Sequence, residues 1–162
     1  IFGEPAASSR QRAIERRIRE ARFREDKNLA DFDWKFNGQA IDRAQIEQLA
    51  TGEFLRRHEN LVMVGQSGVG KSHLLQALSR RHCELGYRVR YTTSADLLDD
   101  LRASLADQTL PRRIGYWSRF DLVIIDEFGF DRIERSECPQ TANLFYKVID
   151  ARSGQRAIVS GA

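Results

Sequence analysis

An eight-residue run in the first half of the chain has the residue types and the spacing that bind a nucleoside triphosphate. It fits G-x-x-x-x-G-K-[ST], in which glycines let the backbone curl and aim consecutive N–H groups at an anion. The lysine brings positive charge to the β- and γ-phosphates, and the hydroxyl that follows is a ligand for Mg²⁺. We therefore predict that this segment binds ATP with Mg²⁺. The predicted nucleotide-binding residues are Gly65, Gln66, Ser67, Gly68, Val69, Gly70, Lys71, Ser72 and His73, of which Lys71 also serves catalysis and Ser72 the metal.

Two adjacent carboxylates, Asp126 and Glu127, provide the second half of the predicted site. They follow the apolar run 122–125, and in open α/β sheets ligands bind at the carboxyl ends of the strands. We expect Asp126 to hold the Mg²⁺ shell, usually through water, and Glu127 to activate a water for attack on the γ-phosphate. A base for water favours hydrolysis over phosphoryl transfer to a small molecule, so a metabolite kinase is disfavoured.

These residues need a strand, a loop and a helix to position them. Residues 60–64 are almost wholly apolar, as expected of a strand buried on both faces of a parallel sheet. Residues 73–85 have the apolar spacing of a helix that Gly86 would end. The apolar stripe of that helix consists of Leu74, Leu75, Leu78 and Cys83.

The rest of the chain alternates strand-like and helix-like segments, which predicts an α/β P-loop fold with a parallel sheet sandwiched by helices. Residues 29–36 carry alternating aromatics and form either a short strand or a hook beside the nucleotide. Further strands are expected at 87–92, at 121–127 and from 156 onward, and further helices at 43–58 after Asp42, after Ser94 and at 139–152.

The N-terminal region is rich in arginine. Residues 8–27 hold eight basic residues against four acidic ones, a surplus of four that exceeds the net charge of +3 of the whole chain. We expect Ser8 or Ser9 to cap a helix that reaches about Asp26 and has a narrow apolar stripe. This helix is either an arm that binds nucleic acid or a partner, or a solvated helix with internal Glu–Arg pairs. The candidate DNA contacts are Arg12, Arg16, Arg17 and Arg19.

A second basic and aromatic stretch covers residues 110–120. It could touch nucleic acid, but aromatic side chains more often pack, so we expect Tyr116 and Trp117 to be packing residues.

Composition narrows the classes of protein that fit. Hydrophobic residues make up 41% and charged residues 30%, which indicates a globular protein, and no apolar run reaches membrane-spanning length. The two cysteines lack C-x-x-C spacing, which argues against a disulfide scaffold or a metal site and favours the reducing cytoplasm. The three histidines are expected to be solvated helix residues.

Several segments resemble the IstB-type ATPases, the AAA+ helper proteins of bacterial insertion sequences, to which the helicase loaders of the DnaC type are closely related. The resemblance covers roughly residues 10–160, and its more specific parts are Ala-Arg-Phe, Asp-Phe-Asp and Asp-Glu-Phe-Gly. The segments that carry it are 21–23, 29–34, 59–73, 125–129 and 142–145.

The resemblance implies a AAA+ core, here residues 37–162, with an N-terminal helix and hook at 1–36. It implies an ATP-dependent, DNA-binding protein that self-assembles and cooperates with a transposase in target-site selection. ATP would lie between neighbouring subunits, one of which supplies an arginine. The alternative within the family is a loader, with the replicative helicase as its partner. From another class, a non-catalytic nucleotide-gated binding module is the alternative.

The chain departs from the family pattern near its end. The family usually has a Thr-Ser-Asn or Thr-Asn-like polar residue at the end of the strand that follows the last helix, where residues 159–161 read Val-Ser-Gly. The family's sensor residue is therefore not identified, and its trans arginine and lid are expected beyond Ala162. Both ends look incomplete, so we expect a piece of a longer protein. The stretch 131–139 looks longer than usual, with Arg132 and Arg135 available for DNA or a neighbouring subunit.

Overall fold

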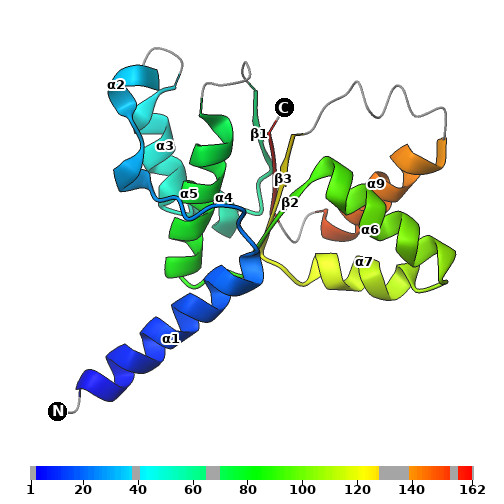
Figure 1. Cartoon of the computed structure of the whole chain (residues 1–162), viewed down its shortest axis with the longest axis horizontal. Coiled ribbons are helices and arrows are strands. Elements are labelled where there is room, and N and C mark those ends of the chain that lie inside the picture. The colour runs from blue at the N-terminus through cyan, green and yellow to red at the C-terminus, as the bar shows by residue number, and fades with distance from the viewer. Residues whose placement is uncertain (1–2, 38–40, 65–69, 128–138, 154–156, 162) are drawn as a thin grey trace.

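A four-stranded parallel sheet forms the centre of the molecule, with strand order β1-β4-β3-β2 (Figure 1). The computed structural model describes residues 3–37, 41–64, 70–127, 139–153 and 157–161. The register places Ile124 of β3 opposite Tyr91 of β2 and Val159 of β4. The predicted parallel sheet is therefore confirmed. Its strands are β1 (Leu61–Met63), β2 (Val89–Thr93), β3 (Leu122–Asp126) and β4 (Ala157–Gly161).

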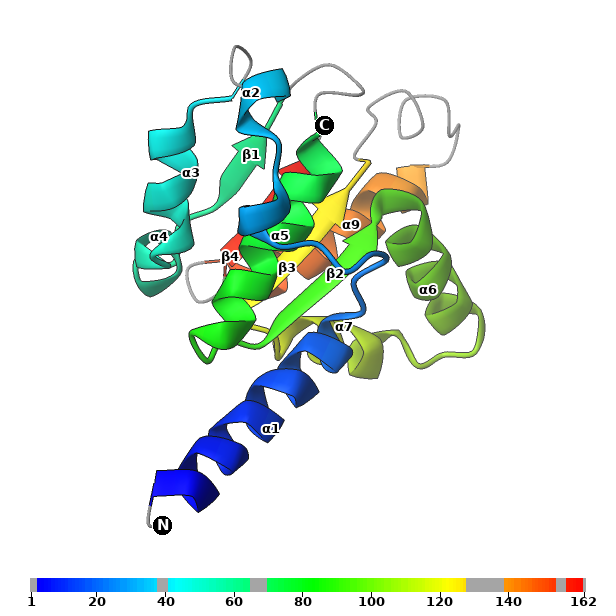
Figure 2. The same ribbon diagram turned by 60° about the vertical axis from the view of Figure 1, so that its left-hand side comes forward.

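Helices cover both faces of this sheet, as predicted (Figures 1 and 2). On one face, α5 (Lys71–Glu84) and the end of α1 (Gly3–Ala21) pack against Leu122 and Ile124 of β3. On the other, three helices pack against Val123 and Ile125. Successive side chains of a strand alternate between faces, so Asp126 lies on the face that α5 covers. The three helices are α6 (Ser94–Ala106), α7 (Leu110–Ser118) and α9 (Pro139–Arg152).

The N-terminal helix α1 extends away from the sheet along most of its length (Figure 2). It begins at Gly3, so the expected cap at Ser8 or Ser9 is wrong; the alanines at 6 and 7 favour helix, and a proline is tolerated in the first turn. It ends at Ala21 instead of Asp26, because Arg22 takes a left-handed conformation (φ 54°) that turns the chain. Among its residues 6–21, for which burial is described, only Ala21 is fully buried, as the narrow apolar stripe predicted.

Residues 29–36 contain no strand. They form the 3-10 helix η1 (Leu29–Asp31) and the start of α2 (Trp34–Asn37), because Asn28 and Asp33 accept hydrogen bonds from nearby backbone N–H groups and favour turns. Phe32 is buried against Leu74 of α5, which fits the hook alternative.

The predicted helix 43–58 is two helices, α3 (Arg43–Ala50) and α4 (Glu53–Arg56). Asp42 caps the first by accepting a hydrogen bond from Ala44 N, as predicted. The break lies at Gly52, whose φ of 78° suits glycine and whose missing Cβ leaves room for the Tyr87 ring.

Three smaller expectations are also wrong. Strand β1 is not buried on both faces: it is an edge strand of the described sheet, and Val62 is 62% exposed. The residue that caps α6 is Thr93, one before Ser94, because its side chain accepts from Asp96 N. His82 is fully buried, since its Nε2 bonds to the carbonyl oxygen of Leu49 at 2.9 Å.

Candidate nucleotide-binding and hydrolysis site

The phosphate-binding run ends on the first turn of α5. Residues 65–69 lie outside the described part of the chain. Gly70 is the N-terminal cap of the helix with φ 86°, a left-handed conformation that a side chain would strain, and Lys71 is the first helical residue. Ser72 follows and is exposed. Amide groups in a first helical turn lack helical partners and attract anions, so this end of α5 suits a phosphate.

His73, in the first turn of α5, contacts residues Asn28 and Phe32 of the N-terminal segment. Its Nε2 lies 3.4 Å from the carbonyl oxygen of Asn28, and its ring meets Phe32 edge-on with centroids 5.2 Å apart. These contacts are structural, and a contact of His73 with nucleotide stays a prediction. They bring the hook residues 28–34 beside the N-terminal end of α5.

Asp126 is the last residue of β3 and its carboxylate is held by two donors. The residue is 3% exposed. The Tyr91 hydroxyl donates to Oδ2 at 2.6 Å, and the Glu127 N–H donates to Oδ1 at 2.8 Å. Burial, then the bond to Asp126, raises the pKa of Tyr91 well above its ordinary value, so the phenol keeps its proton and remains a donor.

Glu127 follows the end of β3, and its backbone conformation is no longer that of a strand. Its φ of 53° is left-handed, which costs a non-glycine residue about 1–2 kcal/mol. The backbone is held there from both sides, since its N–H donates to Asp126 and its carbonyl accepts from the Ser94 hydroxyl at 2.8 Å. The result is one buried carboxylate beside one that is largely exposed, which suits a metal-shell ligand and a base for water respectively.

Arg24 reaches the exposed carboxylate from the segment after α1. Its Nη1 lies 3.7 Å from Glu127 Oε1, and its Nη2 lies 3.2 Å from Asp96 Oδ2 at the start of α6. Sequence reasoning missed both Arg24 and Tyr91. For Tyr91 a signal existed in the sequence pattern. Thr93 lies opposite Asp126 in the sheet, and Tyr91, two residues before Thr93, therefore lies on the same face of the sheet as Asp126.

The topology brings the two halves of the site to the same sheet edge. The carboxyl end of β1 leads toward Lys71 and Ser72, and that of β3 carries Asp126 and Glu127. Strand β4 pairs with both in parallel, so both ends point the same way. The start of α5 and the end of β3 therefore lie toward the same edge of the sheet, and a nucleotide site between them stays a prediction.

The side chains present fit a magnesium ion that is bound mainly by water and phosphate oxygens. Asp126 offers a carboxylate and Ser72 a hydroxyl, both hard oxygen donors. Among the residues that the structure describes, no three histidine, cysteine, aspartate or glutamate side chains gather into a metal site. Mg²⁺ in nucleotide sites needs only one or two protein ligands, in contrast to an all-protein cage.

Comparison with known proteins identifies the family. The profile described as IstB-like ATP binding protein matches residues 2–161. The chain belongs to this family.

A relative of the IstB-like chain is named as an ATP-binding protein of insertion sequence IS21 in Pseudomonas aeruginosa. It is 32% identical over 149 residues, which cover 92% of this chain and 54% of the relative. The chain thus spans about half the length of this curated relative.

Solved structures confirm the AAA+ P-loop fold. AMPPCP-bound DnaA from Aquifex aeolicus matches 87% of the IstB-like chain and 43% of its own with a TM-score of 0.68 at 19% identity. The DnaC helicase loader matches 90% of the chain and 79% of its own with a TM-score of 0.62 at 18% identity.

The four candidate DNA contacts on α1 in the IstB-like chain divide into two groups. Arg12, Arg16 and Arg19 are exposed. Arg17 is half-buried, and its Nε donates to the carbonyl oxygen of Cys83 at 2.9 Å, which fastens α1 to α5. A role for these arginines in DNA binding stays a prediction; Arg132 and Arg135 lie outside the described residues.

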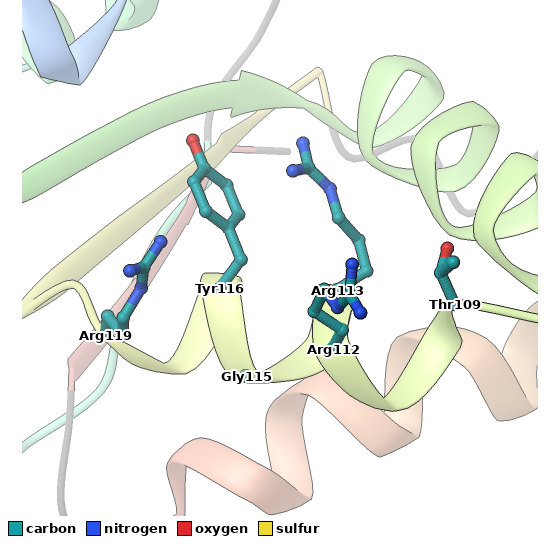
Figure 3. A pocket seen from close by; sticks show the side chains of 6 residues that line it. All are labelled: Thr109, Arg112, Arg113, Gly115, Tyr116 and Arg119. Carbon is teal, nitrogen blue, oxygen red and sulfur yellow. The ribbon is translucent and has the colours of Figure 1, made fainter.

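The second basic stretch of the IstB-like chain forms a shallow pocket on α7, far from the phosphate-binding end of the sheet (Figures 1 and 3). Trp117 is buried, as expected, and donates to Asp100 at 2.9 Å. Tyr116 is half-buried and packs under the Arg113 guanidinium, 4.1 Å from its ring. The pocket is lined by Thr109, Arg112, Arg113, Gly115, Tyr116 and Arg119.

No helix in the described part of this IstB-like chain combines the length and apolarity needed to cross a lipid bilayer.

Proposed function

We propose that this chain is the ATPase core of a DNA-binding helper protein that assists a transposase in selecting its target site. The observation that carries the proposal is the joint placement of the α5 N-terminus and of Asp126–Glu127 at the carboxyl edge of one parallel sheet. Membership of the IstB-like family supports ATP as the nucleotide.

Each residue at this edge has a distinct role in the proposal. Residues 65–70 cradle the phosphates with backbone N–H groups, and Lys71 places its charge on the β- and γ-phosphates. Ser72 and Asp126 are the residues that would hold Mg²⁺, which when bound neutralises the charge that develops on the phosphate oxygens. Tyr91 keeps the Asp126 carboxylate in one orientation.

Hydrolysis depends on Glu127 in this proposal. Its exposed carboxylate lies at the sheet edge where the γ-phosphate would sit and can orient a water and accept its proton. A small-molecule kinase has no use for such a base.

DNA, the transposase and further copies of the chain are the proposed partners. The exposed arginines of α1 can contact phosphates of the DNA backbone. The transposase is proposed because the relative is named after an insertion sequence. Self-association through nucleotide held between neighbouring subunits, in the cytoplasm, completes the proposal.

A second candidate is a replicative helicase loader. It is favoured by one observation, the match of the DnaC helicase loader to 90% of this chain. Co-purification of the full-length protein with the neighbouring transposase, as opposed to the replicative helicase, separates the two candidates.

The proposed function is tested by DNA binding of the full-length protein with ATP, with ADP and with neither. We expect an ATP-dependent oligomer on duplex DNA, and we expect Lys71→Ala to abolish both ATP binding and that oligomer. Equal DNA binding in all three conditions would contradict a nucleotide-dependent helper, and wild-type ATP affinity of the Lys71 variant would contradict the assigned phosphate site.

A further inference from the structure

The segment that follows α1 passes directly beside the proposed catalytic carboxylate. In Figure 2 it leaves the end of α1, runs beside β2 and crosses α5 toward η1. Arg24 lies in this segment and bridges Asp96 and Glu127. Arg24, which contacts Glu127, is thus only three residues beyond the end of the arginine-rich helix α1.

Contacts on both sides of Arg24 fix its place. Before it, the ring of Phe23 packs against Tyr91 with centroids 6.2 Å apart. After it, Glu25 N–H donates to Gln76 Oε1 of α5 at 3.0 Å, and Asp26 pairs with Arg80 of the same helix. The segment therefore rests on β2 and on α5, the elements that carry Tyr91 and the phosphate-binding end.

The segment begins directly at the end of α1, where Ala21 is anchored to the core, so a displacement of α1 can shift the segment. Ala21 is fully buried, and its carbonyl oxygen lies 3.5 Å from Nη1 of Arg90 on β2. The rest of α1 projects outward (Figure 2). A ligand that binds the outer part of α1 and displaces it would therefore shift residues 21–24.

We propose that Arg24 is a positioning residue that restrains Glu127 until α1 engages DNA. This inference rests on the proposed function, since it assigns a regulator to the same catalytic carboxylate. A base must present a carboxylate oxygen to water, and an oxygen that faces a guanidinium is less available for that task. Displacement of the segment by DNA on α1 removes Arg24 and frees Glu127 to orient the water.

The strength of this contact suits a restraint that a ligand can release. The side chains of Arg24 and Glu127 are 50% and 64% exposed, and exposed ion pairs stabilise only weakly. Loss of such a pair changes an equilibrium by about two- to five-fold. The DNA-free rate of hydrolysis should therefore rise by about that factor when Arg24 is neutralised.

The test compares Arg24→Gln with a matched control in the full-length protein. Arg43→Gln is the control, because Arg43 forms another exposed ion pair, with Glu47 on α3 at 2.8 Å. For Arg24→Gln we expect a DNA-free ATPase rate about two- to five-fold above wild type, unchanged ATP affinity, and a smaller ratio of DNA-stimulated to DNA-free rate. Asp96→Asn should move the same quantities in the same direction, because it loosens Arg24 without touching Glu127. A DNA-free rate of Arg24→Gln equal to or below wild type overturns the inference.

A second measurement tests the contact without hydrolysis. Amide hydrogen exchange of residues 22–28 in nucleotide-free protein should be faster in Glu127→Gln than in wild type, while exchange in α3 stays the same. Unchanged exchange at residues 22–28 overturns the restraint even if the protein proves to be an ATPase. A wild-type protein that neither hydrolyses ATP nor binds DNA would instead overturn the proposed function, and the coupling with it.

Discussion

At the scale of single residues, the site depends on a buried carboxylate whose orientation is set by a neighbour on another strand. Among the described residues, Asp126 receives a hydrogen bond from the backbone N–H of Glu127 and one from the side chain of Tyr91. Hydrogen bonds to charged groups are worth about 1.5–3 kcal/mol, more than the exposed ion pairs nearby. Tyr91 should accordingly matter more to catalysis than its position in the hydrophobic core suggests.

Removal of the Tyr91 hydroxyl tests this role. Tyr91→Phe keeps the ring in the core but leaves Asp126 free to rotate, so we expect ATP hydrolysis to fall about ten-fold and the Mg²⁺ concentration needed for half-maximal rate to rise. Tyr87→Phe, on a residue that packs near Gly52, is the control and should leave both quantities unchanged. A Tyr91→Phe protein with wild-type Mg²⁺ dependence would contradict the role.

At the level of single helices, replacing Gly52 and Gly115 by alanine should change stability in opposite directions, because their conformations and surroundings differ. Gly52 separates α3 from α4 with φ 78°, and a Cβ there would lie 3.3 Å from the Tyr87 ring. Gly115 lies inside α7 with nothing within 4 Å of an added Cβ. We expect Gly52→Ala to destabilise the fold by about 1–3 kcal/mol and Gly115→Ala to leave it unchanged or stabilise it by up to about 1 kcal/mol. Chemical denaturation measures both, and equal effects would contradict the assigned conformations.

His82 of α5, buried against the carbonyl oxygen of Leu49 on α3, should make the stability of the fold depend on pH. Burial lowers the pKa of His82 to about 4, because the charged ring would lose its hydration. The unfolded chain binds a proton near pH 6.5 and the native state does not, so stability is complete above that pH and falls as the pH drops toward 4. We expect about 2 kcal/mol less stability at pH 5 than at pH 8 from this group. His82→Gln should flatten this dependence, whereas His58→Gln, at an exposed position, should leave it as it is.

The elements also show where sequence reasoning succeeds and where it does not. Helix α5 and strand β3 form as predicted, because the helical spacing of residues 73–85 and the apolar run 122–125 are local sequence patterns. Residues 29–36 have the alternation of a strand, but side-chain caps at Asn28 and Asp33 favour turns instead. Arg24 was beyond prediction, because its partners lie 72 and 103 residues later in the chain and meet it only through the fold.

At the scale of the whole molecule, a basic helix projects from one side of the α/β core and is joined to it through Arg17 and residues 21–26 (Figure 2). The outer arginines can contact DNA while Arg17 keeps the helix in place. Neutralising Arg12, Arg16 and Arg19 together should weaken DNA binding and lower the slope of log affinity against log salt by about three. Arg43→Gln, on α3, provides the control. An unchanged slope would show that α1 is not the DNA contact.

The proposed function requires that ATP bound at the start of α5 is hydrolysed with the help of Glu127. The most direct measurement compares ATP binding and phosphate release by the full-length protein with those of Glu127→Gln. We predict that the variant binds ATP with wild-type affinity, while its rate of phosphate release falls by a factor of about 100 or more. Phosphate release at the wild-type rate by the Glu127 variant would show that Glu127 is not the base for hydrolysis.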